Sequence, residues 1–276
     1  SYNLPDKILL RSDGTSVYIT QDVYLAYKKK KDFNFDKSIY IVGNEQNMYF
    51  RQLFAVLDML QFEGENYHLS YGMVYLPSGK MKSREGTVVD ADDLVQEVIH
   101  LAYEEVSQRY PDLKEEEKRE RSVTIGMAAI RFYILKYNPK KDFTFFPDQS
   151  ISFEGETGPY VQYVYSRIAS IFQKSKLNLN DHYDPTLLTT EIELKLIDQL
   201  NYYPEIIDEA VNSYDTHLIA DYLLNLAQTF NNFYTYCPVI SEDIHLQMAR
   251  LALIKCVQIV IKTGLKILGI KVLSNM

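Results

Sequence analysis

The spacing of apolar and polar residues divides the chain into a mixed first part and a helical second part. Within the first 90 or so residues, two short runs rich in β-branched and aromatic side chains, 16–19 and 38–43, predict buried strands. A helix over 22–31, capped by Thr20, is predicted between them, and a second helix over 46–60 follows. Strands that alternate with helices are typical of a parallel α/β sheet.

Two further strands are expected at residues 68–71 and 73–76, where the pattern favours a hairpin. From residue 93 onward apolar residues recur at helical spacing and no strand pattern returns, which predicts a helix bundle. The predicted helices cover 93–110, 114–136, 154–174, 185–200, 206–213, 217–234 and 241–268. Prolines and polar residues between 138 and 149 separate the halves, so we expect domains at 1–148 and 149–276.

Composition narrows the class of protein. A chain of 276 residues is long enough for two domains, and a hydrophobic content of 46% excludes a disordered chain. Cys237 and Cys256 form no disulfide-like framework and residues 1–6 carry no signal-peptide pattern, which favours a reducing, cytoplasmic location. Lysines interrupt the apolar stretch 251–273, so no membrane span is expected. The net charge of -8 still allows a local basic face that binds nucleic acid.

A basic loop over residues 79–89 is the first candidate for chemistry. Lys80, Lys82 and Arg84 place three cations between Gly79 and Gly86. Such a loop suits a polyphosphate whose charge rises during a reaction. The alternative is a solvated surface turn, because short motifs of this kind are weak evidence alone.

Three residues near the predicted strand ends form the second candidate. Ligands of open α/β sheets bind outside the C-terminal strand ends, where we expect Tyr18, Asp22 and Gln46 to converge. Asp22 could accept two parallel hydrogen bonds from a guanidinium, which an ammonium cannot reproduce. The alternatives are that Asp22 only caps its helix and that Tyr18 belongs to the core.

The helical half carries a third candidate. Residues 230–236 combine aromatic rings with amides, a composition suited to unstacked RNA bases. The last predicted helix carries cations beside an apolar stripe: Arg250, Lys255, Lys262 and Lys266. The alternative is that Phe230 and Phe233 are core residues and that the lysines are merely solvated.

Several segments, in order along the chain, resemble the arginyl-tRNA synthetases, a family of class I aminoacyl-tRNA synthetases. Residues 10–22 are similar to the family's S-D-G-T-x-x-Y-x-x-x-D segment, and 41–46 to its V-V-G-x-x-Q segment. Residues 80–84 resemble the KMSKS loop. Residues 154–167 and 249–270 resemble the entry and the closing helix of the helical anticodon-binding (DALR) domain. The resemblance implies the C-terminal part of a class I Rossmann-like catalytic domain followed by an α-helical bundle.

The family's activity implies roles for individual residues. They are arginine binding by Tyr18, Asp22 and Gln46; ATP binding by Gly43, Met73, Lys80, Met81, Lys82 and Ser83; catalysis by Lys80, Lys82 and Arg84; and tRNA binding by Tyr160, Arg167, Tyr234 and Tyr236. The implied partners are L-arginine, ATP and tRNA(Arg), with neither DNA nor a membrane. Mg²⁺ is expected to accompany ATP without a dedicated protein site.

The chain departs from the family pattern in two places. Ser83 replaces the second lysine of the KMSKS motif, and no two of the five histidines have the spacing of the His-Ile-Gly-His motif. We therefore expect the C-terminal part of a synthetase, inactive by itself. Alternatives are a non-catalytic tRNA-binding module or another class I synthetase, such as the cysteinyl one. The latter is disfavoured because the segments around Tyr18, Asp22 and Gln46 match the arginyl pattern.

Overall fold

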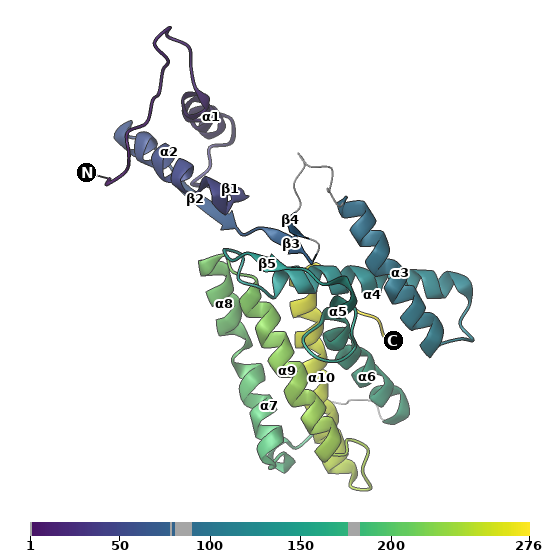
Figure 1. The fold of residues 1–276 in the computed structure, drawn as a ribbon. Helices are drawn as coiled ribbons and strands as arrows, with labels where there is room; N and C mark the ends of the chain where they lie inside the picture. Colours follow the sequence, from purple (N-terminus) through teal and green to yellow (C-terminus); the bar gives the residue numbers. More distant parts are fainter. Residues whose placement is uncertain (1, 78, 81–89, 176–182) are drawn as a thin grey trace. The chain divides into compact units, whose positions relative to one another are not determined.

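The structure, a computed structural model, describes residues 2–77, 79–80, 90–175 and 183–276. It contains two compact units (Figure 1). Unit 1 comprises Ser1–Met73 together with Pro139–Phe143, and unit 2 comprises Val74–Asn138 together with Thr144–Met276. Unit 1 is therefore completed by a segment distant in sequence.

Unit 1 is a small α/β arrangement. Its elements are α1 (Tyr18–Phe33), β1 (Lys37–Gly43), the 3-10 turn η1 (Asn44–Gln46), α2 (Asn47–Met59) and β2 (Glu65–Tyr71). Strands β1 and β2 pair in parallel, with Lys37 opposite Glu65 and Gly43 opposite Tyr71. A parallel sheet is therefore present, but β2 takes the place of the strand predicted over 16–19, and the C-terminal ends of β1 and β2 lie side by side.

The core of unit 1 lies between its two helices and one face of the sheet. On α2, Phe50, Leu53 and Leu57 recur at helical spacing and are buried. On α1, Ile19 and Ala26 share one face, and both are fully buried. The helices are therefore fixed by burial of these apolar stripes.

The predicted strand over residues 16–19 is wrong. Helix α1 begins at Tyr18, and only Ser16 forms an isolated bridge, with Leu10. Burial of Ile19 on the helical face outweighs the β propensity of the run, because tertiary packing overrides local preference. Thr20 lies inside the helix rather than capping it, and its hydroxyl donates to the Leu9 carbonyl.

The predicted hairpin over 68–76 is also wrong. Residues 68–71 end β2, which pairs with β1, and Val74–Leu76 form β3 of a separate sheet. The backbone between them is held by the distant segment: Gly72 N donates to the Pro139 carbonyl at 2.7 Å, and Phe143 N donates to the Met73 carbonyl at 3.1 Å. A Cβ at Gly72 would lie 2.2 Å from the Lys141 carbonyl oxygen, so this close approach requires glycine.

Unit 2 is predominantly helical (Figure 1). Its small sheet has the order β4–β3–β5, formed by β3 (Val74–Leu76), β4 (Gly79–Lys80) and β5 (Phe143–Thr144). The helical elements are α3 (Ala91–Arg109), α4 (Glu115–Leu135), α5 (Pro147–Ser150), α6 (Gly158–Ser175), η2 (Pro185–Leu187), α7 (Glu191–Asn201), α8 (Tyr203–Ser213), α9 (His217–Tyr236) and α10 (Ile244–Ile267). The predicted helices from residue 93 onward are thus confirmed, with shifted ends and with η2 and α7 in place of one helix.

Helix α10 packs within the bundle, where α6, α7 and α9 all contact it (Figure 1). Among the described residues, α10 alone is long and apolar enough to cross a membrane. Most of it is buried inside unit 2, and core helices share this length and composition. Its start is capped by Asp243, whose Oδ1 accepts hydrogen bonds from His245 N and Leu246 N.

Candidate functional sites

The three residues predicted to bind a guanidinium line one pocket of unit 1, which we call the α1–α2 pocket. Its volume is about 660 Å³. Tyr18 and Asp22 stand one turn apart on α1, and Gln46 ends η1. The structure therefore brings together three side chains that sequence spacing alone placed near each other. The other lining residues are Asp6, Lys7, Ile8, Val17, Ile19 and Tyr49.

Asp22 does not cap α1, which excludes the simplest structural role for its carboxylate. The N-cap position is Val17, and no side chain caps the helix. The half-buried Asp22 instead accepts a hydrogen bond from the Tyr49 hydroxyl. Among the residues that the structure describes, no lysine or arginine forms an ion pair with Asp22, and the side chain of Tyr18 is 82% exposed rather than in the core. A carboxylate facing a pocket without a cationic partner can receive one.

Two of the six residues predicted to contact ATP, Gly43 and Met73, meet at the strand ends of unit 1. Gly43 ends β1, and a Cβ there would lie 3.0 Å from Met73 Cε and 3.7 Å from the Tyr71 ring. Asp142 Oδ1 accepts hydrogen bonds from Asn44 Nδ2 at 3.1 Å and from Met73 N at 2.7 Å. Asp142 thus holds both strand ends together, although it lies far from them in the sequence.

The basic loop is described only at its start. Gly79 and Lys80 form β4, where Lys80 is opposite Tyr75. Met81, Lys82, Ser83 and Arg84 lie outside the described residues. The predicted roles of this loop therefore rest on the sequence.

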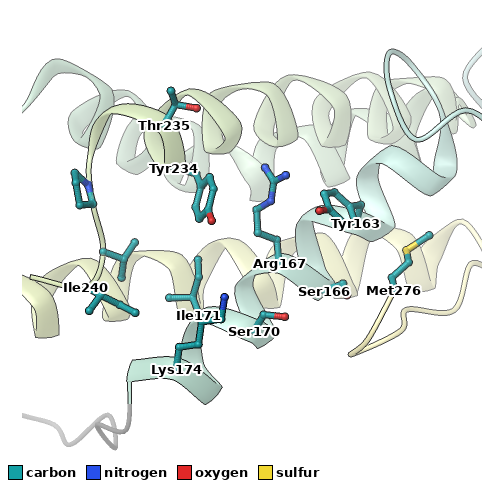
Figure 2. Close-up of a pocket in the computed structure, with 12 residues that line it drawn as sticks. Tyr163, Ser166, Arg167, Ser170, Ile171, Lys174, Tyr234, Thr235, Ile240 and Met276 are labelled. Carbon is teal, nitrogen blue, oxygen red and sulfur yellow. The ribbon is translucent and has the colours of Figure 1, made fainter. Parts of the chain in front are cut away.

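A second pocket, which we call the α6–α9 pocket, lies in unit 2 and has a volume of about 750 Å³. Figure 2 shows the Arg167 side chain between the rings of Tyr163 and Tyr234. The guanidinium carbon lies 4.7 Å from each ring centroid, a cation–π arrangement on both sides. Lys174 adds a second cation to the lining. The pocket therefore combines positive charge with aromatic faces, which suits a nucleotide.

Asn231 fixes the arginine of this pocket. Its Oδ1 accepts a hydrogen bond from Arg167 Nη1 at 2.7 Å, and its Nδ2 donates to the Tyr160 hydroxyl at 2.8 Å. Tyr160 is thus joined to Arg167 through Asn231, although it does not line the pocket. Because the guanidinium is held before any ligand arrives, its remaining donors are pre-oriented.

The aromatic run of α9 separates into core and surface residues. Phe230 and Phe233 are fully buried, which confirms the core interpretation for these two. Tyr234 and Tyr236 are 44% and 71% exposed. Tyr234 lines the α6–α9 pocket with Phe230 behind its ring, at 6.3 Å between centroids, whereas Tyr236 lies outside the lining.

The expectation that Arg250 belongs to a basic surface is wrong. Its side chain is buried, Nε donates to Glu193 Oε1 at 2.7 Å, and Nη1 donates to the Pro238 carbonyl at 2.7 Å. Arg250 is buried because the face of α10 that carries it packs against α7. Lys255, Lys262 and Lys266 do lie on the exposed side of α10.

The sequence did not point to three polar residues that hold the candidate sites together: Tyr49, Asn231 and Asp142. Tyr49 follows Gln46 by three residues, a spacing that places side chains on one helical face and was the available signal. Asn231 was visible only as an amide within the aromatic run, and no local pattern links Asp142 to Asn44. In the described parts of the chain, no group of three or more His, Cys, Asp or Glu residues has metal-site geometry.

Two family descriptions match this chain. Residues 1–146 match the family described as "tRNA synthetases class I (R), catalytic domain", and residues 161–276 match "DALR anticodon binding domain". The first match covers more than half of the chain. Together the two matches account for both parts that the sequence pattern distinguishes.

The curated relatives that match this chain are named arginine–tRNA ligase. The chain is 43% identical over 99% of its length to the arginine–tRNA ligase of Porphyromonas gingivalis, of which it covers 47%. It is 45% identical over 99% of its length to that of Flavobacterium psychrophilum, of which it covers 46%. The chain therefore spans about half the length of the curated relatives it matches.

Solved structures agree with the sequence comparison. Thermus thermophilus arginyl-tRNA synthetase matches with a TM-score of 0.88 at 27% identity, over 98% of this chain and 51% of that one. The Plasmodium falciparum enzyme matches with a TM-score of 0.82 at 25% identity, over 97% of this chain and 46% of that one. Fold, motif order and sequence identity agree, and the chain belongs to the arginyl-tRNA synthetase family of class I tRNA synthetases.

Proposed function

We propose that this chain acts as part of an arginine–tRNA ligase, the full-length protein. It activates L-arginine with ATP to arginyl-adenylate and pyrophosphate, and then transfers the arginyl group to the 3′ end of tRNA(Arg). The proposal rests on the α1–α2 pocket, which Tyr18, Asp22 and Gln46 line together. The Asp22 carboxylate has no cationic partner among the described residues. We place this function in the cytoplasm and divide the chain at 1–148, catalytic, and 149–276, anticodon-binding.

Asp22 is the proposed partner of the substrate guanidinium. A carboxylate that accepts two parallel N–H bonds rejects lysine, whose ammonium is a point charge, and citrulline, whose side chain is neutral. Tyr18 and Gln46 shape the walls of the same pocket. A site built on such hydrogen bonds discriminates against analogues without an editing domain.

ATP is proposed to bind beside this pocket, at the strand ends of unit 1. Support comes from Gly43 and Met73, which lie against each other where ligands of parallel sheets bind. The resemblance to the family assigns ATP binding to the loop residues Lys80, Met81, Lys82 and Ser83 as well, and Mg²⁺ would be held chiefly by the ATP phosphates.

The chemical step is an in-line displacement. An oxygen of the arginine carboxylate forms a bond to the α-phosphorus while the bond to the pyrophosphate oxygen breaks, and pyrophosphate leaves. No covalent enzyme intermediate is involved. Lys80, Lys82 and Arg84 are proposed to stabilise the charge that develops on the phosphates, so that catalysis is positioning plus electrostatics.

The helical domain over residues 149–276 is proposed to bind the anticodon arm of tRNA(Arg). The α6–α9 pocket supports this because Arg167 and Lys174 attract phosphate while the 44% exposed ring of Tyr234 adds an aromatic surface. Tyr160 supports Arg167 through Asn231, and Tyr236 is an exposed ring on the same helix as Tyr234.

The decisive experiment is Asp22→Asn in the full-length protein. Arginine-dependent ATP–pyrophosphate exchange, measured with tRNA present, should show a KM for arginine raised roughly 10²–10⁴-fold, since two hydrogen bonds to a charged group are weakened. The KM for ATP should change much less. The matched control is Asp32→Asn on the same helix, because Asp32 forms only an exposed ion pair with Lys28. Normal arginine kinetics in a folded Asp22→Asn protein would show that the pocket assignment is wrong.

A further inference from the structure

Tyr49 lies at the start of α2 and faces the α1–α2 pocket. It is half-buried, lines the pocket together with Asp22 and Gln46, and donates its hydroxyl to Asp22 Oδ2. Its ring packs edge-on against Phe50 in the core, with 5.4 Å between the ring centroids. Core packing therefore fixes the ring, and the ring in turn fixes the hydroxyl that meets the carboxylate.

Without the hydrogen bond from Tyr49, the Asp22 carboxylate could rotate among many orientations. The terminal torsion of an aspartate is broad, because it joins an sp³ carbon to an sp² carbon. A bidentate guanidinium contact requires both oxygens to lie in one plane with the N–H groups. A single hydrogen bond to Oδ2 restricts that torsion and leaves the remaining lone pairs of the carboxylate for a ligand.

The Tyr49 donor does not titrate near neutral pH. Burial raises the pKa of the Tyr49 hydroxyl above its ordinary value, and its hydrogen bond and charge interaction with Asp22 raise it further. The hydroxyl therefore remains protonated at neutral pH. Lys7 Nζ lies 5.5 Å from the Tyr49 ring centroid, and among the described residues it makes no ion pair with Asp22.

We propose that Tyr49 is a positioning residue for the substrate guanidinium, acting by holding the Asp22 carboxylate in the orientation that two parallel N–H bonds require. The inference rests on the proposed arginine site and adds a residue outside the segments that suggested it. Tyr49 acts on binding rather than on the chemical step, so its effect belongs in the KM for arginine. The restriction also favours arginine over lysine, because an ammonium does not need both oxygens in a set plane.

The test is Tyr49→Phe in the full-length protein, which removes only the hydroxyl. ATP–pyrophosphate exchange should show a KM for arginine raised roughly 10- to 100-fold, the effect of losing one hydrogen bond to a charged group. The kcat and the KM for ATP should change less than about twofold. The matched control is Tyr27→Phe: the Tyr27 hydroxyl, on α1, donates to the Leu60 carbonyl at the end of α2 at 3.2 Å but does not touch the pocket. This control should leave all three constants unchanged.

A double-mutant cycle separates positioning through Asp22 from independent action. In the Asp22→Asn background, Tyr49→Phe should change the KM for arginine by less than about twofold, because the carboxylate it orients is absent. Tyr49→His provides an aromatic ring with an N–H donor, so it should recover part of the lost arginine affinity. It can also replace Tyr49→Phe in the test if that variant is unstable. An equal effect of Tyr49→Phe in both backgrounds would overturn the inference.

The two proposals fail in different ways. If Asp22→Asn raises the KM for arginine and Tyr49→Phe leaves it unchanged, Tyr49 is only a core residue and the arginine site stands. If Asp22→Asn leaves arginine kinetics normal, the arginine site itself is wrong and the role of Tyr49 falls with it.

Discussion

Arg250 and Glu193 form a buried ion pair in unit 2, with Arg250 Nε 2.7 Å from Glu193 Oε1. Glu193 also completes a capping box with Thr190 at the start of α7, and Arg250 donates to the Pro238 carbonyl. Pro238 lines the α6–α9 pocket. The pair therefore connects α10, α7 and the loop after α9, and it supports one wall of the pocket from behind.

We predict that Arg250→Met lowers the stability of the helical unit. Removing one partner leaves the Glu193 charge buried and uncompensated, which costs about 3–5 kcal/mol. Thermal unfolding of the full-length protein, followed by circular dichroism, should show a lower Tm for the transition of the helical unit. Lys262→Met on the exposed face of the same helix is the control and should leave that transition within error. Equal transitions for both variants would contradict the structural role of the pair.

The same ion pair predicts that part of the free energy of unfolding is lost at acid pH. Burial raises the pKa of Glu193, but hydrogen bonds from Thr190 and Arg250 together outweigh it, so the pKa lies below the ordinary value of 4.5. A lowered folded pKa stabilises the protein above pH 4.5, and this contribution is lost as the pH falls through the folded value. Glu193→Gln should therefore flatten the fall of Tm below pH 4.5, whereas Glu191→Gln, at an exposed position of the same helix, should preserve it.

For the α6–α9 pocket, we predict that Tyr234→Ala weakens tRNA(Arg) binding by ~1–3 kcal/mol, the value of one base–aromatic stack. Filter binding at a fixed salt concentration measures the change, and nuclease footprinting should show protection of the anticodon loop that weakens in the variant. Tyr202→Ala, a 53% exposed tyrosine outside the pocket lining, is the control. Protection confined to other parts of the tRNA would rule out the anticodon assignment.

For the basic loop, we predict that Lys80→Ala and Lys82→Ala each slow adenylate formation roughly 10²–10³-fold, the cost of removing one preorganised charge from a developing anion. Arginine affinity should change little, because the loop acts on the phosphates. Pre-steady-state adenylate formation at saturating arginine is the measurement. Unaltered rates in both variants would indicate a surface turn.

Helices were more predictable from the sequence than strands. In unit 2, apolar residues such as Leu223, Phe230 and Leu265 recur at helical spacing because they face one core, so the pattern records the packing directly. Short runs are ambiguous: residues 16–19 have strand-like composition, yet Ile19 is buried on a helix. The sequence between β2 and β3 suggested a turn because nothing local indicates that Gly72 bonds to Pro139.

The residues of the candidate sites also differ in how well the sequence predicts them. Tyr18 and Asp22 share one motif, and Gln46 ends a second motif on a neighbouring element, so the sequence could predict that they converge. Arg250 was misassigned because a cation beside an apolar stripe has the same pattern whether it faces water or a buried carboxylate. Asp142 could not be found, since its partners Asn44 and Met73 lie 98 and 69 residues away in the sequence.

Because Pro139–Phe143 belongs to unit 1, this unit cannot be completed until residue 143 has been synthesised. Gly72 and Met73 leave the ribosome about 70 residues before the segment that binds them, a delay of roughly 4–14 s at ~5–20 residues per second. During this interval the C-terminal end of β2 lacks Asp142 and its backbone partners, while α3 and α4 are already available to fold. The strand ends proposed to hold ATP are therefore completed only after the first helices of unit 2 have been made, so a translational pause near residue 143 would expose an unfinished sheet end.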